Sequence, residues 1–121
     1  MTDATLLLRQ IHPSFVKLGH PTSAAFRPTP KDEHKLSVYD GDLITVAAAY
    51  AHYRGRKLES HGEMAVTVAE CNAQELPARP SPENFPEHAE IDFAGLSNSQ
   101  CEKKGKKLRD VAEQRGWLHQ E

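Results

Sequence analysis

Three chemically active side chains alternate with apolar ones in the segment 88–93. His88, Glu90 and Asp92 occupy every second position, a period typical of a half-buried strand. An imidazole and two carboxylates on one face of a strand could bind a divalent metal or serve as general acid and base. The alternative is the solvent face of an amphipathic strand, which needs polar residues at these positions. We favour the solvent face and predict no metal site, because this spacing spreads the three groups over more than ~13 Å.

A second candidate is the long segment that precedes residues 36–39. Residues 12–35 are rich in proline, which disfavours regular helix. Loops of this length in small domains are often functional. Its polar side chains could frame a site for an anion or phosphate; they are Ser23, Arg27, Thr29, Lys31 and Asp32. The segment could equally be an ordered cover over one edge of a sheet.

The remaining reactive residues follow no pattern with a known chemistry. The seven histidines show no metal-binding spacing, and Cys71 and Cys101 lie too far apart for a Cys-x-x-Cys site. The lysines of 103–107 share their segment with acidic residues, which favours a solvated helix face with local ion pairs. We therefore expect neither a bound cofactor nor nucleic-acid binding.

These residues need elements to position them, and the sequence predicts an α+β fold in a single domain of residues 1–121. We expect a small, mostly antiparallel sheet of about four strands packed against two helices, with long proline-rich loops at 12–35 and 72–87. Apolar or alternating segments predict the strands at 5–11, 36–39, 64–71 and 88–93. Capping residues and apolar periodicity predict the helices at 46–54 and 99–115, with N-caps at Thr45 and Ser99 and ends at Gly55 and Gly116.

Composition narrows the class of protein. The chain has 121 residues, 38% of them hydrophobic, and a formal net charge of -2. This balance gives no overall attraction to nucleic acids or anionic lipids. The apolar segments are too short for a membrane span or a signal peptide, so we expect no membrane association and a cytoplasmic location. Residues 61–100 are acidic between basic flanks, which fits either internal complementarity or a polarised binding surface.

Several short motifs resemble a family of small uncharacterised bacterial proteins. The motifs are His12-Pro13-Ser14-Phe15, Thr22-Ser23-x-x-Phe26-Arg27-Pro28-Thr29, Leu36-Ser37-Val38 and Pro86-x-His88-Ala89. The resemblance covers most of the chain and implies a bacterial protein, but it carries no activity with it.

A second resemblance is to small ADP-ribosyltransferase-like toxins of the RES type, through Arg9 in a first strand and Ser37 in a later one. The resemblance implies that the arginine grips NAD, the serine supports the nicotinamide end, and a glutamate polarises the ribose. Glu70 or Glu90 fits the third role. The chain departs from the pattern because it has no Ser-Thr-Ser triplet and no Glu-x-Glu, so the glutamate stays undecided. A buried Arg9 paired with a core carboxylate is the structural alternative.

We therefore predict a small cytoplasmic bacterial binding protein with a protein partner. The family resemblance suggests an accessory role in a toxin, defence or stress locus. The segments 20–35 and 83–92 are the expected binding surfaces. The alternative is an NAD-using, ADP-ribosyltransferase-like enzyme, in which Arg9, Ser37 and Glu90 or Glu70 converge on one cleft. The sequence does not decide whether the protein is an enzyme, and it gives no oligomeric state.

Overall fold

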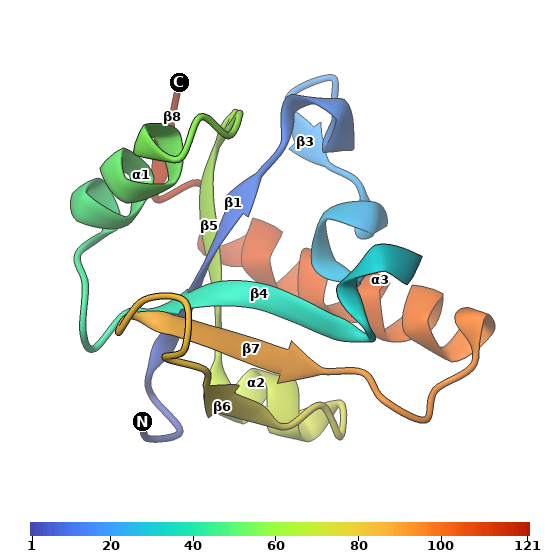
Figure 1. Ribbon diagram of the computed structural model, residues 1–121. Coiled ribbons are helices and arrows are strands. Elements are labelled where there is room, and N and C mark those ends of the chain that lie inside the picture. Colours follow the sequence, from blue (N-terminus) through green and yellow to red (C-terminus); the bar gives the residue numbers. More distant parts are fainter.

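A six-stranded antiparallel sheet forms the centre of the molecule (Figure 1). The computed structural model describes residues 1–121, apart from the side chain of Pro30. The strands lie in the order β6–β7–β4–β1–β5–β8, and their bounds are β1 Leu6–Ile11, β4 Lys35–Asp40, β5 Gly62–Thr67, β6 Ala78–Pro80, β7 His88–Asp92 and β8 His119–Gln120. The other elements are a ribbon of β2 (Val16–Lys17) and β3 (His20–Pro21), the 3-10 turns η1 (Pro13–Phe15), η2 (Ser23–Phe26) and η3 (Pro30–Asp32), and the helices α1 (Val46–Gly55), α2 (Val68–Ala73) and α3 (Asn98–Arg115).

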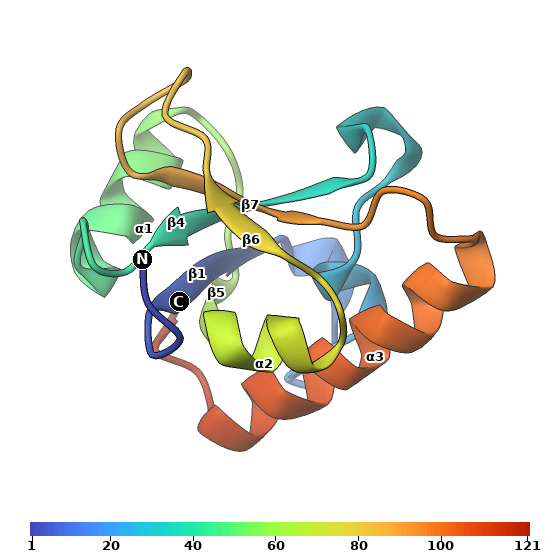
Figure 2. The same ribbon diagram turned by 90° about the horizontal axis from the view of Figure 1, so that it is seen from below.

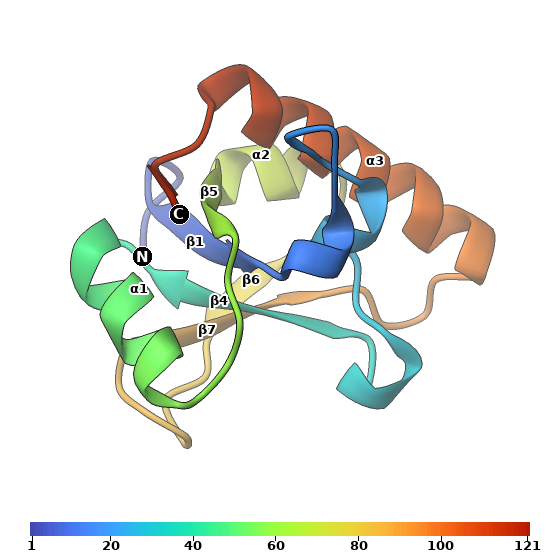
Figure 3. The same ribbon diagram turned by 90° about the horizontal axis from the view of Figure 1, so that it is seen from above.

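The two faces of the sheet are covered unequally. Figures 2 and 3 show α2 and α3 on one face and α1 on the other. The larger core lies on the α3 side, and its large buried side chains include Leu7, Ile11, Phe26, Leu36, Met64 and Phe93. The smaller core lies on the α1 side and includes Leu8, Ala49 and Ala65. Helix α1 packs on β1, β5 and β8. The half of this sheet face that is formed by β4 and β7 is therefore left open.

The prediction of about four strands and two helices is wrong, because the structure has six strands in the sheet, a two-stranded ribbon and three α-helices. The short strands β2, β3, β6 and β8 hold only two or three residues each. Strands this short carry no visible period and form only where a neighbouring strand supplies hydrogen bonds. The segment predicted as a strand over 64–71 divides after Thr67, whose side chain caps α2 in a capping box with Glu70.

Helix ends were partly predictable from capping residues. Thr45 caps α1 as predicted, with its side chain accepting from the Ala48 N–H. α3 begins one position after Ser97, which forms a capping box with Gln100, instead of at the predicted Ser99. Both sites fit the same capping pattern, and the structure uses the earlier one.

Among the described residues, no helix combines the length and the apolar character needed to span a bilayer.

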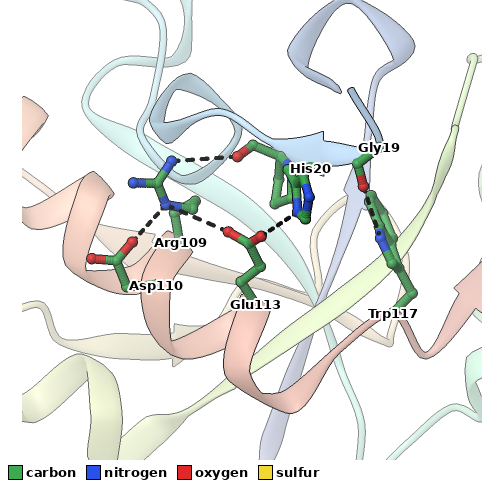
Figure 4. A network of polar contacts seen from close by, with 7 residues as sticks. Gly19, His20, Arg109, Asp110, Glu113 and Trp117 are labelled. Carbon is green, nitrogen blue, oxygen red and sulfur yellow. Dashed lines mark hydrogen bonds and ion pairs between the residues drawn. The ribbon is translucent and has the colours of Figure 1, made fainter. Parts of the chain in front are cut away.

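Side chains fasten the β2–β3 ribbon to α3 and the residues that follow it (Figure 4). His20 Nδ1 lies 2.5 Å from Glu113 Oε2, and Arg109 Nε lies 4.0 Å from the other oxygen of the same carboxylate. The Trp117 indole N–H donates to the Gly19 carbonyl at 3.4 Å. The first part of the predicted long loop is therefore held on the α3 side of the sheet.

Candidate functional site

The open half of the α1-side face carries a cleft with two compartments. The inner one is a cavity of about 90 Å³ and the outer one is a trough of about 250 Å³. They share Ser37, Asn84 and His88, so they form one continuous site. Figure 2 shows that the segment 81–87 and η3 both rise on the side of the sheet away from α3. These two segments and the C-terminal end of α1 wall the cleft, and β4 and β7 form its floor.

Strand alternation places the floor residues. Ser37 and Tyr39 share one face of β4, and His88 and Glu90 share the same face of β7. Ser37 lies directly opposite Glu90, and Tyr39 lies directly opposite His88. The register of the β4–β7 pair therefore decides which polar groups meet at the bottom of the cleft.

Aromatic rings and one arginine enclose the inner compartment. The Arg56 guanidinium carbon lies 5.3 Å from the centroid of the Phe85 ring, within the range of cation–π attraction. The Phe85 ring also packs on Tyr39 at 5.3 Å between centroids. The Tyr39 hydroxyl lies 2.8 Å from His52 Nδ1. Burial raises the pKa of Tyr39, and the adjacent Arg56 offsets only part of that rise. The Tyr39 hydroxyl therefore keeps its proton at neutral pH.

Arg9 joins β1 to β4 where their pairing ends. The two strands pair at Leu8 and Tyr39, and one residue further the Arg9 guanidinium donates through Nη1 to the Ser37 carbonyl at 3.0 Å. Its Nε donates to the Ala25 carbonyl at 2.9 Å. Burial lowers the pKa of Arg9 from its ordinary value. The partners of Arg9 are thus two backbone carbonyls rather than the core carboxylate that the sequence offered as an alternative.

A buried polar cluster lies beside the inner compartment, on β1 and β5. Glu63 is 0% exposed and sits directly opposite Gln10, which lines the compartment. Burial raises the pKa of Glu63 to about 7, more than the neighbouring Gln10 amide lowers it. Ser60 Oγ lies 2.9 Å from Gln10 Oε1 and 3.0 Å from the Gly62 carbonyl. A hydroxyl has one proton and donates to only one of these oxygens.

One arrangement gives the Ser60 hydroxyl, the Gln10 amide and the Glu63 carboxyl a partner each. If the Gln10 amide is turned end for end, its Nε2 donates to Ser60 Oγ, and the Ser60 hydroxyl donates to Gly62. Gln10 Oε1 then takes the place of Nε2, and a protonated Glu63 carboxyl can donate to it. In the opposite orientation, Gln10 Nε2 and both Glu63 oxygens have no partner among the described residues. Both the cluster geometry and the raised pKa indicate a neutral Glu63 below about pH 7.

The structure brings together three of the four residues that the sequence proposed as catalytic. Arg9 and Ser37 both line the inner compartment, and Ser37 and Glu90 both line the trough. Glu90 Oε1 lies 3.8 Å from Lys35 Nζ. Glu70 lies elsewhere, at the start of α2, with Arg115 Nη1 3.0 Å from its Oε1. Of the two glutamates proposed for the same role, only Glu90 lines the cleft.

Glu70 forms an ion pair with Arg115 that links two helices. Burial acts to raise its pKa, but hydrogen bonds from Arg115 and Thr67 outweigh that effect and leave the pKa lowered. Glu70 is therefore ionised at neutral pH, and it ties α2 to the C-terminal end of α3 on the opposite face of the sheet.

The five residues proposed as an anion-binding frame are divided between separate places. Lys31 and Asp32 line the trough. Arg27 and Thr29 line a different pocket, of about 360 Å³, beside the first turn of α3. Ser23 lines neither pocket, and its hydroxyl accepts from Arg27 Nη1 at 3.4 Å. The segment 20–35 thus contributes to two surfaces rather than to one frame.

The alternating residues of β7 have separate partners. The His88 Nδ1–H donates to the Ser81 carbonyl at 2.8 Å, and Asp92 Oδ2 accepts from Arg79 Nη2 at 2.9 Å. Within the part of the chain that the structure describes, no group of three or more potential metal ligands occurs. In this arrangement β7 supplies polar groups to the cleft floor and an ion pair to β6.

Sequence reasoning missed several residues of the inner compartment. Tyr53 lies within the helix predicted over 46–54, and the sequence assigned it no role in a site. Phe85 lies between prolines in a polar segment. An isolated aromatic residue in such a segment was the one sequence feature that could have pointed to a role in a site. Nothing local in the sequence places Arg56 over Phe85. No family model, curated protein or solved structure matches the chain, so the cleft is the evidence on which a function can be argued.

Proposed function

We propose that the protein binds a small ligand in the cleft over β4 and β7. The observation that carries this proposal is the continuity of an aromatic inner compartment with a polar trough through Ser37, Asn84 and His88. Small-molecule sites typically combine apolar walls with a few polar groups that fix orientation. Here the walls are aromatic, and the polar groups project from two strands whose register is fixed by the sheet.

A protein partner in the cytoplasm stays a prediction. The segments expected to bind it, 20–35 and 83–92, supply parts of the cleft wall and floor, including Lys31, Asp32, Asn84 and Glu90. A concave site with an enclosed inner end suits a small molecule better than the flat face of a folded partner. We therefore place the ligand of the cleft in the small-molecule class.

A ligand screen on a blocked variant tests this proposal. Ser37 is exposed at the junction of the two compartments, so Ser37→Trp fills the cleft without entering the core. In a thermal-shift screen of planar polar compounds, we expect those that raise the Tm of the wild type to leave Ser37→Trp unchanged. Ser99→Trp, on the exposed first turn of α3, is the matched control and should respond like the wild type. Compounds that stabilise all three proteins equally, or a library without a single hit, would contradict the proposal.

A second candidate function is NAD-dependent ADP-ribosyl transfer, and one observation favours it. Arg9, Ser37 and Glu90 lie on the neighbouring strands β1, β4 and β7. Arg9 contacts the Ser37 backbone at 3.0 Å, and Ser37 faces Glu90 across the strand pair. These are the residues to which the transferase resemblance assigns roles. Against this, both described partners of the Arg9 guanidinium are backbone carbonyls.

Nicotinamide release from NAD tests the second candidate. If the protein is a transferase, replacing Glu90 with glutamine should lower the rate by about 10²-fold or more, because an amide stabilises developing positive charge on the ribose poorly. Glu70→Gln is the control, since Glu70 lies on the other face of the sheet. Nicotinamide release should be followed by chromatography with each variant. Absence of release by the wild type, or equal rates for the wild type and Glu90→Gln, would exclude the transferase.

A further inference from the structure

We propose that the inner compartment of the cleft is an oxyanion subsite, which takes a carboxylate or phosphate carried on a planar ligand. This inference rests on the proposed function and names the chemistry of the ligand. The geometry that points to it is a small cavity with two guanidinium-bearing residues, aromatic walls and no acidic residue in its lining.

The charge of the lining is one-sided. Arg9 and Arg56 both line the compartment, and every other described lining residue is uncharged or a histidine. The Arg9 guanidinium already donates to the Ala25 and Ser37 carbonyls, so Arg56 is the cation that pairs with a ligand. The one histidine, His88, donates its Nδ1–H to the Ser81 carbonyl. Glu63 lies beside the compartment, in the buried polar cluster, but keeps its proton below about pH 7. A ligand anion therefore meets positive charge here without a competing carboxylate.

The aromatic walls hold the cationic group in place. The Arg56 guanidinium lies over the Phe85 ring and also interacts with the Tyr39 hydroxyl. Its remaining N–H groups can donate to a ligand in the plane of the guanidinium. Tyr39 and Tyr53 line the compartment from β4 and α1. Guanidinium pairs with carboxylates and phosphates through two parallel hydrogen bonds.

The trough differs in charge, and this orients the ligand. Its lining combines Lys31 and Lys35 with Asp32, Glu33 and Glu90, so it has no preference for a net anion. The inner cavity of about 90 Å³ is smaller than the ~150 Å³ that admits a benzene ring. We therefore place the oxyanion in the inner compartment and the ring of the ligand at the junction, toward the trough.

Probes with the same phenyl ring and either an anionic or a neutral substituent test this orientation. Benzoate, phenyl phosphate and neutral benzamide should be titrated at millimolar concentrations, with amide chemical shifts as the readout. We expect benzoate or phenyl phosphate to bind about tenfold or more tightly than benzamide, because hydrogen bonds to a charged group are the stronger ones. The preferred anion distinguishes a carboxylate ligand from a phosphate ligand, and inorganic phosphate shows whether the ring contributes.

An arginine pair supplies the protein-side control. Arg56→Gln should lose the preference for the anion, whereas Arg54→Gln should keep it. Arg54 lies in the last turn of α1, two residues before Arg56, but outside the compartment, and it donates to the Leu58 carbonyl. Equal binding of benzoate and benzamide would overturn the oxyanion subsite while leaving the cleft as a ligand site. An unchanged anion preference in Arg56→Gln would also overturn it. Failure of all the probes to bind the wild type would count against both the subsite and the proposed function.

Discussion

Replacing Glu63 with glutamine is expected to stabilise the protein by about 2–3 kcal/mol at about pH 8 and to change little at about pH 4. Glutamine has the shape of the protonated acid and can donate to Gln10 in the same way. Glu63 is buried, and its pKa is raised from 4.5 to about 7. Glutamine carries no titratable proton, so folding of the variant costs no free energy for protonating or burying an ionised side chain at this position.

The sign of the pH dependence follows from proton binding. Between about pH 4.5 and 7 the folded state holds a proton on Glu63 that the unfolded state has released. Stability therefore declines as the pH rises through this window, and the contribution of the neutral carboxyl is gone above it. Urea unfolding of the wild type should show this decline, and Glu63→Gln should lack it. Glu102→Gln, an exposed change on α3, is the control. Equal pH profiles for Glu63→Gln and the wild type would show that Glu63 is ionised in the folded protein.

Replacing Arg9 with methionine is expected to destabilise the protein by about 3 kcal/mol. Methionine fills a similar volume but leaves the Ala25 and Ser37 carbonyls without the donor that now reaches both. The stability of Arg9→Lys should lie between those of the wild type and Arg9→Met, because an ammonium is a compact point charge that cannot reproduce the fork geometry of a guanidinium.

Urea unfolding at one pH measures this effect. Arg54→Met is the matched control, because Arg54 is exposed on α1 and exposed substitutions usually change stability by less than ~0.5 kcal/mol. A wild-type stability for Arg9→Met would mean that Arg9 does not hold β1, β4 and η2 together.

The parts of the fold that the sequence could predict are those encoded locally. The N-cap Thr45 defines the start of α1, and the alternation over 88–93 predicts β7 correctly to within one residue. The edge strands β6 and β8 could not be predicted, because their few residues become strands only by pairing with β7 and β5. α2 was missed because its apolar β-branched start has strand composition, while its capping box lies within the same few residues.

The candidate site shows the same division. Arg9, Ser37 and Glu90 could be proposed from their residue types and order, but their proximity depends on the strand order β7–β4–β1 and on the register of Ser37 against Glu90. The stacking of Arg56 on Phe85 joins the end of a helix to a distant proline-rich segment. A single sequence carries no periodicity that reports such a long-range contact.

An amide chemical-shift map of the protein with phenyl phosphate or benzoate tests the central claim most directly, because it locates the ligand. The cleft predicts that the shifted amides fall in 35–39 on β4, in 81–90 and at the end of α1 near Tyr53 and Arg56. The same map with Ser37→Trp should show these shifts lost. Shifts centred on α2 and α3, or spread over the molecule without a focus, would contradict a ligand site over β4 and β7.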